Sequence, residues 1–383
     1  MAAGVGWSGR VRVQGGAAPG ADGQGRPLLK LLLVEDSRSV VAFLEQILRR
    51  EPDIELLPHV ANGRDAVVAV QRWSPQLVLM DLVLPGGMDG VEAITEIMAT
   101  APCPIVVLSG QLETPGRDRT FESLRAGAVD VLAKPTVGGL EAVKEFRERL
   151  LRTVRVMAHA RVVGRRRMSL RTPAVVTPPP SQVVAAPEPR PCSLLAIGGS
   201  TGAPPLVFEL LKALPSPAPF PVVVAQHIVR GFEPGFARWL GGTGHRTMVA
   251  QGGEWLEPGV VYVSPADRDL VVRGGKLQTQ ASRGVAVPSV DALFESVAGF
   301  YGSRAVGLLL TGMGEDGARG LLTMRQTGAL TVAQEGTSCV VDGMPGAARA
   351  LGAASQALTP GEMSALMAAL GKTTPSPSGR GSG

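Results

Sequence analysis

The chain has 383 residues, of which 45% are hydrophobic, 19% are charged and 4% are aromatic. This length is typical of two domains, and the hydrophobic fraction supplies enough apolar side chains for two cores. The formal net charge of +5 is a modest excess that does not by itself indicate a nucleic-acid-binding protein. No apolar run reaches the ~20 residues needed to span a bilayer, so we expect no membrane insertion.

Neither a secretion signal nor a disulfide framework is predicted. The N-terminus has no basic segment followed by an apolar core. The three cysteines lie far apart without the CxxC spacing of many zinc sites, at Cys103, Cys192 and Cys339. We therefore expect a protein of the reducing cytoplasm.

The first half of the chain predicts an α/β domain. Residues 1–27 are rich in Gly and Ala and predict a disordered extension. From residue 28 to residue 152, apolar runs alternate with helix-like segments. The expected strands are 28–34, 54–58, 76–80, 104–109 and 129–133. This alternation is typical of a parallel, doubly wound sheet, here with five strands.

The second half predicts a linker and a larger α/β domain. Residues 153–192 are rich in Arg and Pro and predict an extended linker. The linker arginines cluster at Arg161, Arg165, Arg166, Arg167 and Arg171. In the expected domain at 193–369, strands are predicted at 193–198, 220–226, 259–264, 269–273, 304–312 and 329–334, with helices at 203–214, 289–301 and 317–328. We expect a second doubly wound, mainly parallel sheet, then a flexible tail at 370–383.

Polar residues follow the strands of the first predicted domain. Glu35 and Asp36 follow the first strand, and Asp81 follows the third. Ser109 and Lys134 follow the fourth and fifth. Open α/β sheets place their functional sites at this edge, and converging carboxylates require a hard cation such as Mg²⁺. A carboxylate beside Mg²⁺ can accept a phosphoryl group, whose oxygens a lysine and a hydroxyl can hold.

Four motifs in this half resemble the response-regulator receiver family: VEDS (34–37), MDLVLPGGMDG (80–90), VLSG (107–110) and AKP (133–135). The resemblance implies phosphorylation of Asp81 by a histidine kinase. It also implies a Mg²⁺ site, a switch hydroxyl and a phosphate-binding lysine. The metal ligands would be Glu35, Asp36, Asp81 and the carbonyl of Val83, and the switch residues would be Ser109 and Lys134.

Two features depart from the receiver pattern. Gly86 and Gly87 stand where the family usually has one residue, which changes the loop beside the metal site. Val131 stands where many receivers carry a switch aromatic residue. The alternative interpretation is a degenerate receiver that takes no phosphate.

The second predicted domain begins with a candidate nucleophile. The spacing Gly198-x-Ser200-x-Gly202 follows a short strand and precedes a helix, as in a nucleophile elbow. Small neighbours permit the sharp turn that exposes a serine hydroxyl. A plain Gly-rich turn is the alternative, and the pattern also resembles a phosphate-binding loop, although GxxxxGK[ST] is absent.

A serine nucleophile needs a base and a carboxylate that orients it. His227 ends the strand that follows Ser200 in the chain, so both residues are expected at one sheet edge. Asp316 follows another apolar strand and is the best candidate carboxylate, ahead of Glu315 and Asp342. The other histidines are His59 and His159, in or near the first domain, and His245, in an expected surface turn.

Residues 193 to about 369 resemble the catalytic domain of chemotaxis protein-glutamate methylesterases. The motifs are GGSTGAP (198–204), QHIVRGF (226–232), GVVYVSPADRDL (259–270), PSVDALF (288–294), LLTGMGEDGARGL (309–321) and SCVVDGMPGAA (338–348). The resemblance implies a triad of Ser200, His227 and Asp316. The backbone N–H groups of Thr201 and Met313 would form the oxyanion hole.

This family resemblance also implies the substrate and the regulation. The substrates would be glutamyl methyl esters on the cytoplasmic helices of methylated chemoreceptors, with deamidation of receptor glutamines as a second activity. No cofactor is expected for the esterase reaction. An unphosphorylated receiver docked over the strand ends would block a bulky substrate, and phosphate on Asp81 would favour an open arrangement.

Two other functions stay open at this point. A phosphorylation-controlled DNA-binding regulator would account for a receiver and an arginine cluster, but it needs a helix-turn-helix or similar output module. A catalytically silent receptor adaptor would keep the fold without the chemistry. For the enzyme we expect a monomer that binds no nucleic acid.

Overall fold

The structure is a computed structural model. It describes residues 28–110, 119–134, 139–160, 162, 192–282, 284 and 286–372. The predicted N-terminal extension, most of the predicted linker with its arginine cluster, and the predicted tail from residue 373 onward lie outside the described residues.

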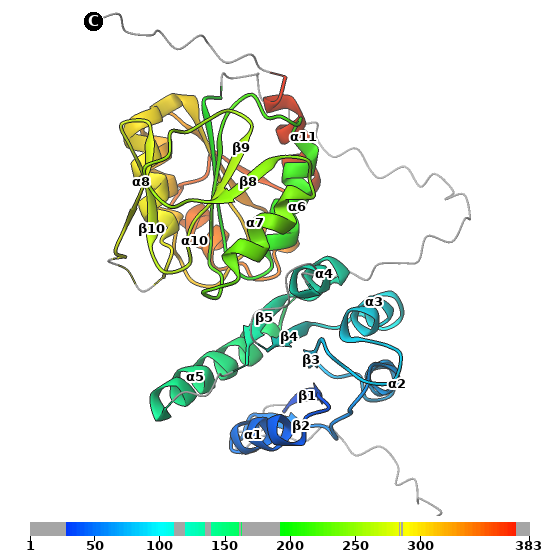
Figure 1. The fold of residues 1–383 in the computed structure, drawn as a ribbon. Helices are drawn as coiled ribbons and strands as arrows, with labels where there is room; N and C mark the ends of the chain where they lie inside the picture. The colour runs from blue at the N-terminus through cyan, green and yellow to red at the C-terminus, as the bar shows by residue number, and fades with distance from the viewer. Residues whose placement is uncertain are drawn as a thin grey trace, which may run out of the picture.

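A five-stranded parallel sheet forms the first domain, as predicted, in the order β2-β1-β3-β4-β5 (Figure 1). Its strands are β1 (Leu29–Val34), β2 (Ile54–Leu56), β3 (Leu77–Asp81), β4 (Ile105–Ser109) and β5 (Asp130–Ala133). Its helices are α1 (Arg38–Leu48), α2 (Gly63–Trp73), α3 (Gly90–Thr100), α4 (Arg119–Ala126) and α5 (Leu140–Met157).

Both faces of this sheet are buried, because successive residues of a strand point to opposite sides. Leu31 and Leu33 of β1 pack in the layer that contains α1 and α5. Leu32 and Val34 pack in the layer that contains α2 and α3. The apolar runs read from the sequence are therefore continuous rather than alternating.

A larger parallel sheet of seven strands forms the second domain, in the order β14-β13-β12-β6-β7-β9-β8. Its strands are β6 (Leu194–Gly199), β7 (Val222–Gln226), β8 (Arg246–Val249), β9 (Val260–Val263), β12 (Ala305–Leu309), β13 (Leu330–Gln334) and β14 (Gln356–Leu358). A separate antiparallel hairpin joins β10 (Asp269–Arg273) to β11 (Lys276–Gln280).

Helices cover both faces of the second sheet (Figure 1). They are α6 (Ala203–Ala213), α7 (Glu233–Gly241), α8 (Val290–Tyr301), α9 (Ala318–Gln326), α10 (Met344–Ala350) and α11 (Pro360–Leu370), with short 3₁₀ turns η1 (Gly302–Arg304) and η2 (Gly336–Ser338). Leu195 and Ile197 of β6 face α6, α7 and α11. Leu194 and Ala196 face α8, α9 and α10.

Several segments differ from the sequence-based expectation. The predicted strand at 269–273 lies in the separate hairpin, and β8, β11 and β14 were not predicted. Helix α5 continues to Met157, beyond residue 152 where the first domain was expected to end, because Val154 and Met157 are fully buried against the sheet. His245 does not lie in a surface turn. It is 4% exposed directly before β8, and its Nε2 lies 2.9 Å from the carbonyl oxygen of Leu211.

The two domains meet where α4 packs against α6 and α7, with β5 beside the contact (Figure 1). Phe121 of α4 is 2% exposed and belongs to the same continuous apolar cluster as Phe208 and Phe236 of the second domain. The junction therefore has a packed apolar centre. Among the described residues, no helix has the length and apolar character needed to cross a bilayer.

Helix α8 allows a matched test of the second core. Phe294 is fully buried, whereas Phe300 on the same helix is 42% exposed. We expect Phe294→Ala to lower the free energy of unfolding by about 3–5 kcal/mol, because it leaves a cavity in the core. Phe300→Ala should cost much less. Urea denaturation followed by circular dichroism measures both, and a larger loss for Phe300→Ala would contradict this description of the core.

Candidate active site

A sharp turn between β6 and α6 carries Ser200. Within it Gly202 has a φ of +78°, in the left-handed region that favours glycine. The backbone N–H of Ser200 donates to the carbonyl of Thr311 (3.1 Å), and Nε2 of Gln226 donates to the carbonyl of Ser200 (2.8 Å). Ser200 therefore has the strand–turn–helix context of a nucleophile elbow, and its backbone is fixed by two neighbouring strand ends.

His227 and Asp316 form a direct contact from two other strand ends. His227 follows β7, and Asp316 lies in the loop between β12 and α9. Nε2 of His227 lies 2.8 Å from Oδ2 of Asp316, and the two side chains are 18% and 13% exposed. Because the pair is largely shielded from water, this hydrogen bond is electrostatically stronger than one that is exposed to solvent.

The N-terminal end of α8 holds the Asp316 carboxylate. The N–H groups of Val290 and Asp291 donate to it at 2.7 and 3.0 Å, and the hydroxyl of Ser289 donates at 3.2 Å. Burial alone would raise the pKa of Asp316, but the hydrogen bonds from His227 and from the helix backbone outweigh it and lower that pKa. An ionised Asp316 can keep the proton on Nε2 of His227.

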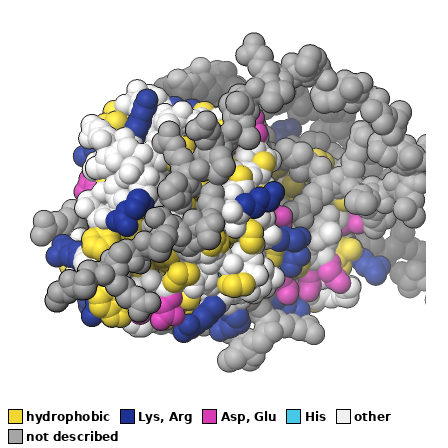
Figure 2. Space-filling model, turned by 90° about the horizontal axis from the view of Figure 1, so that it is seen from above, with side chains coloured by type: hydrophobic (Ala, Val, Ile, Leu, Met, Phe, Trp, Pro, Cys, Tyr) yellow, Lys and Arg dark blue, Asp and Glu magenta, His cyan; other side chains and the backbone are white. Residues whose placement is uncertain are grey.

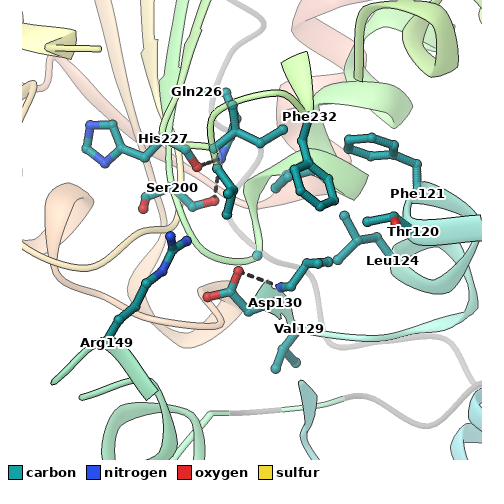
Figure 3. Close-up of a pocket in the computed structure, with 15 residues that line it drawn as sticks. Thr120, Phe121, Leu124, Val129, Asp130, Arg149, Ser200, Gln226, His227 and Phe232 are labelled. Carbon is teal, nitrogen blue, oxygen red and sulfur yellow. Dashed lines mark hydrogen bonds between the residues drawn. The ribbon is translucent and has the colours of Figure 1, made fainter. Parts of the chain in front are cut away.

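Ser200 and His227 line the same cavity, together with Asp130 and Phe121 of the first domain (Figure 3). Among the described residues, no hydrogen bond joins the Ser200 hydroxyl to the imidazole. Nε2 of His227 is engaged by Asp316, so Nδ1 is the nitrogen left to accept a proton. Hydrogen bonds of this kind often become short only when a substrate is bound.

Gly312 allows a close approach beside the nucleophile. A Cβ atom at this position would lie 2.6 Å from the Cβ of Ser200, which is closer than two non-bonded carbon atoms come in folded proteins. The loop after β12 can therefore pass next to the Ser200 turn only because residue 312 has no side chain. The same loop places Met313 and Asp316 on this side of the sheet.

The two residues expected at the oxyanion hole both contact the first domain. Thr201 is 8% exposed, and its hydroxyl donates to the carboxylate of Asp130 in β5 at 3.1 Å. Met313 is partly buried against the apolar cluster of α1 and α5. Burial at this junction raises the pKa of Asp130. The first domain thus covers the rim around Ser200.

A second polar cluster lies at the strand ends of the first domain. Oxygen atoms of Glu35, Asp36 and Asp81 lie within 4.8 Å of one another. Nζ of Lys134 lies 2.7 Å from Glu35 and 2.9 Å from Asp81. Burial raises the pKa of Glu35. Burial opposes the charge on Lys134, but its hydrogen bonds to the two carboxylates prevail and raise the pKa of the amine.

The remaining predicted residues of this cluster lie around it. The hydroxyl of Ser109 is 3.4 Å from that of Thr120, in the first turn of α4. The Val83 side chain is 67% exposed in the loop after β3. That loop accommodates its additional residue through Gly86 and Gly87, which have φ values of +93° and +79°. Such values are accessible to glycine without strain.

Comparison with known proteins matches two separate parts of the chain. The CheB methylesterase family profile matches residues 195–367, and the response regulator receiver domain profile matches residues 31–157. The protein-glutamate methylesterase/protein-glutamine glutaminase 3 of Myxococcus xanthus is 38% identical over 89% of this chain and 93% of its own. A protein of the same name, numbered 4, from Geobacter metallireducens is 39% identical over 87% of this chain and 96% of its own.

This chain belongs to the CheB methylesterase family. It is an enzyme of the receiver-linked protein-glutamate methylesterase type. Among solved structures, the CheB methylesterase catalytic domain of Thermotoga maritima matches with 31% identity and a TM-score of 0.44, covering 47% of this chain and 98% of that one.

The sequence-predicted residues fall into two groups in space. Ser200, Thr201, His227, Met313 and Asp316 lie around one edge of the larger sheet. Glu35, Asp36, Asp81, Ser109 and Lys134 lie around the equivalent edge of the receiver sheet, with Val83 in the adjoining loop. The alternative carboxylate Asp342 pairs with Arg349 instead.

Three contributors to the site were not predicted. Ser289 caps α8 and reaches Asp316, and a serine before an apolar helix is a recognisable cap signal. Gln226 supports the backbone of Ser200 and of His227. Asp130 reaches Thr201 across the domain junction, for which the sequence offers no local signal.

The lowered pKa of Asp316 leads to a pH-dependent prediction. Ionised Asp316 stabilises the fold above its unfolded-state pKa of about 3.9, and this stabilisation is lost as the pH falls through the lower folded-state value. We expect Asp316→Asn to lower the free energy of unfolding at pH 7 by about 2 kcal/mol. The difference in the free energy of unfolding between Asp316→Asn and the wild type should become smaller below about pH 4. The midpoints of urea denaturation, determined for both proteins from pH 7 to below pH 4, measure this difference.

Asp267→Asn is the control, because Asp267 is 41% exposed in a surface ion pair with Arg230. It should change the urea midpoint little at any pH. A gap between wild type and Asp316→Asn that widened with acidification would contradict the assignment of a stabilising, ionised Asp316.

Proposed function

We propose that the chain hydrolyses glutamyl methyl esters on the cytoplasmic helices of methylated chemoreceptors and deamidates receptor glutamines. The catalytic residues would be Ser200, His227 and Asp316. The observation that carries this proposal is the His227–Asp316 hydrogen bond of 2.8 Å at the sheet edge that also bears Ser200. The relatives named as methylesterases and glutaminases support the reaction class.

The reaction uses the serine as a covalent nucleophile. Oγ of Ser200 attacks the ester carbonyl carbon while its proton passes to Nδ1 of His227. The imidazolium returns the proton to the leaving methoxide, so methanol departs and an acyl-serine forms. Water then attacks the acyl-serine by the same route and releases the glutamate side chain. With a glutamine substrate, ammonia leaves in place of methanol.

The negative charge on the tetrahedral intermediate needs donors. In this proposal the backbone N–H groups of Thr201 and Met313 supply them, each worth ~3 kcal/mol of transition-state stabilisation. Thr201 directly follows the nucleophile, which is where an elbow places one donor. Met313 directly follows Gly312, whose missing side chain lets this loop approach Ser200.

Phosphorylation of Asp81 by a histidine kinase would control access to this site. Glu35, Asp36 and Asp81, with the carbonyl of Val83, would hold Mg²⁺, and their clustered oxygen atoms fit a hard cation. When bound, the ion neutralises charge on the transferred phosphoryl group. Ser109 and Lys134 would then bind the phosphoryl oxygens.

The docked receiver would inhibit the esterase by covering it. The Thr201 hydroxyl is already bonded to Asp130, and Met313 packs against the receiver layer of α1 and α5. In this proposal, a receptor helix would not reach Ser200 while these contacts persist. Phosphorylation must favour the undocked arrangement energetically to raise activity. We propose that the enzyme works in this way as a cytoplasmic monomer in two-component signalling.

The alternatives find less support. A DNA-binding regulator would need a helix-turn-helix or similar output module, whereas the second domain is built on a seven-stranded parallel sheet. On the one face that Figure 2 shows, Lys and Arg side chains are interspersed with hydrophobic and acidic ones. A silent adaptor would not need an ionised Asp316 held against His227. A serine-directed covalent probe that failed to label Ser200 would favour the adaptor.

The first functional prediction concerns the nucleophile. Ser200→Ala should lower kcat for methanol release from methylated receptor by about a million-fold, because no covalent route remains. Ser193→Ala, directly before β6, should retain wild-type activity. Circular dichroism checks that both variants fold. Methanol release by folded Ser200→Ala near the wild-type rate would rule out this mechanism.

The second functional prediction concerns the phosphoacceptor. With a small phosphodonor and Mg²⁺, wild-type activity should rise by about 5- to 150-fold, the range of ordinary allosteric coupling. Asp81→Asn should keep the basal activity and lose this rise, because an amide cannot accept the phosphoryl group. Asp89→Asn, in the α3 cap, is the control and should retain activation. Activation of Asp81→Asn equal to wild type would exclude Asp81 as the acceptor.

A further inference from the structure

The side chain of Gln226 lies beside the Ser200 turn. Gln226 ends β7, is 2% exposed, and lines the cavity that also contains Ser200 and His227. Its Nε2 donates to the backbone carbonyl of Ser200 at 2.8 Å and to that of His227 at 3.1 Å (Figure 3). Because both partners are acceptors, only the NH₂ end of the amide can occupy this position. One side chain therefore holds the backbone of two candidate catalytic residues.

The Ser200 carbonyl belongs to the same peptide group as the N–H of Thr201. This group is planar and trans, so its C=O and N–H point in opposite directions. The carbonyl accepts from Gln226 and, within the turn, from the N–H of Ala203 at 3.1 Å. The N–H of Thr201 has no acceptor among the residues that the structure describes. Gln226 therefore helps to fix the direction of a donor that these residues leave unused.

The peptide group between Gly312 and Met313 is held in the same way. The Gly312 carbonyl accepts from the N–H groups of Gly343 and Met344 at 3.2 and 3.0 Å. Within the described part of the chain, the N–H of Met313 has no acceptor. Both candidate oxyanion donors are thus unused, while the carbonyl of each peptide is bonded twice. Of the donors to these two carbonyls, Gln226 supplies the one that comes from a side chain, so a substitution can remove it.

The amide of Gln226 is not an economical choice for stability alone. Its Oε1 is buried and has no hydrogen-bond partner among the described residues. A buried acceptor without a donor carries a desolvation cost, and an apolar side chain of the same length would not have this cost. The NH₂ group is therefore the part of Gln226 that matters, and its partners are the two carbonyls at the site.

We propose that Gln226 is a positioning residue of the oxyanion hole. It directs the Thr201 N–H toward the carbonyl oxygen of the substrate by holding the opposite end of the same peptide. A hydrogen bond at the C=O also polarises the peptide group and strengthens its N–H as a donor. The benefit grows as negative charge develops on the substrate oxygen, so it favours the transition state over the bound ester. This inference rests on the proposed function and adds a residue outside the triad.

The first test is Gln226→Met in the full-length, phosphodonor-activated enzyme. Met has a similar length and no donor. We expect kcat for a methylated receptor cytoplasmic fragment to fall on the order of ten- to a hundred-fold, because a misdirected donor costs less than a deleted one. KM should stay within about three-fold of the wild-type value, because the ester is bound before the charge develops. An unchanged kcat would overturn the proposal.

Gln356→Met is the matched control. Gln356 also has a buried Oε1 without a partner among the described residues, but it lies in the edge strand β14. This variant should keep the wild-type kcat. In Gln226→Met the loss of two hydrogen bonds and the removal of an unpaired acceptor oppose each other, so its urea midpoint should change only modestly. A loss of kcat that was explained by unfolding at the assay temperature would indicate a structural role and would contradict positioning.

Butylboronic acid provides a readout that does not need turnover. Oγ of Ser200 adds to the boron atom while its proton passes to His227. The boron becomes tetrahedral and negatively charged, and one of its oxygens takes the place of the oxyanion. The Kd of this adduct should rise in Gln226→Met by about the factor by which kcat/KM falls. Equal boronate Kd values for the variant and the wild type would overturn the proposal.

The pH profile separates an effect on the peptide from an effect on the imidazole. Gln226 also bonds the His227 carbonyl, but it does not contact the His227–Asp316 pair. The midpoint of the rise of kcat/KM with pH should therefore be the same in Gln226→Met and in the wild type. A shifted midpoint with unchanged boronate binding would assign the effect to His227 and contradict the proposal.

Gln226→Glu provides a second variant if Gln226→Met does not fold. Its neutral carboxyl can donate an O–H to the Ser200 carbonyl, whereas its carboxylate cannot donate. Activity relative to the wild type should therefore fall as the pH rises through the pKa of this carboxyl, and a constant ratio would overturn the proposal. If the wild type hydrolyses no receptor ester but binds the boronate more tightly than Gln226→Met does, the proposed function fails and the positioning role stands.

Discussion

The hydrogen bonds accepted by the Asp316 carboxylate are the interactions on which the site of the second domain depends. The carboxylate joins the loop after β12 to the start of α8 through backbone N–H groups, and to the end of β7 through His227. These segments are distant in the chain and meet only because parallel strands end at a common edge. The helix end keeps the carboxylate ionised, and the ionised carboxylate orients the imidazole. One partly buried charge therefore serves both the fold and the arrangement of the candidate catalytic residues.

Much of this arrangement could be predicted because it depends on strand ends. Once β6, β7 and β12 are recognised as buried parallel strands, Ser200, His227 and Asp316 must lie near one another. The same reasoning brings Asp81 and Lys134 together in the receiver. Ser289 illustrates a partial signal, because its capping role is local whereas its contact with Asp316 is not.

Contacts between the domains could not be predicted from the chain. The bond from Thr201 to Asp130 and the packing of Phe121 on Trp239 depend on how two separately folded sheets are oriented. Neither residue pair has a characteristic spacing or motif. The expectation for His245 failed for a related reason, since the Gly-rich sequence before β8 indicated a turn but could not indicate that the turn would be covered.

The missing side chain at Gly312 limits how this gene can change over evolutionary time. Even an alanine codon would bring a methyl group within 2.6 Å of the Ser200 Cβ, so either the loop or the nucleophile would have to shift. The receiver, whose polar cluster lies in a separate sheet, would be untouched. Under the proposed function, such an allele would encode a chain that keeps its phosphoacceptor but loses the packing that positions the nucleophile.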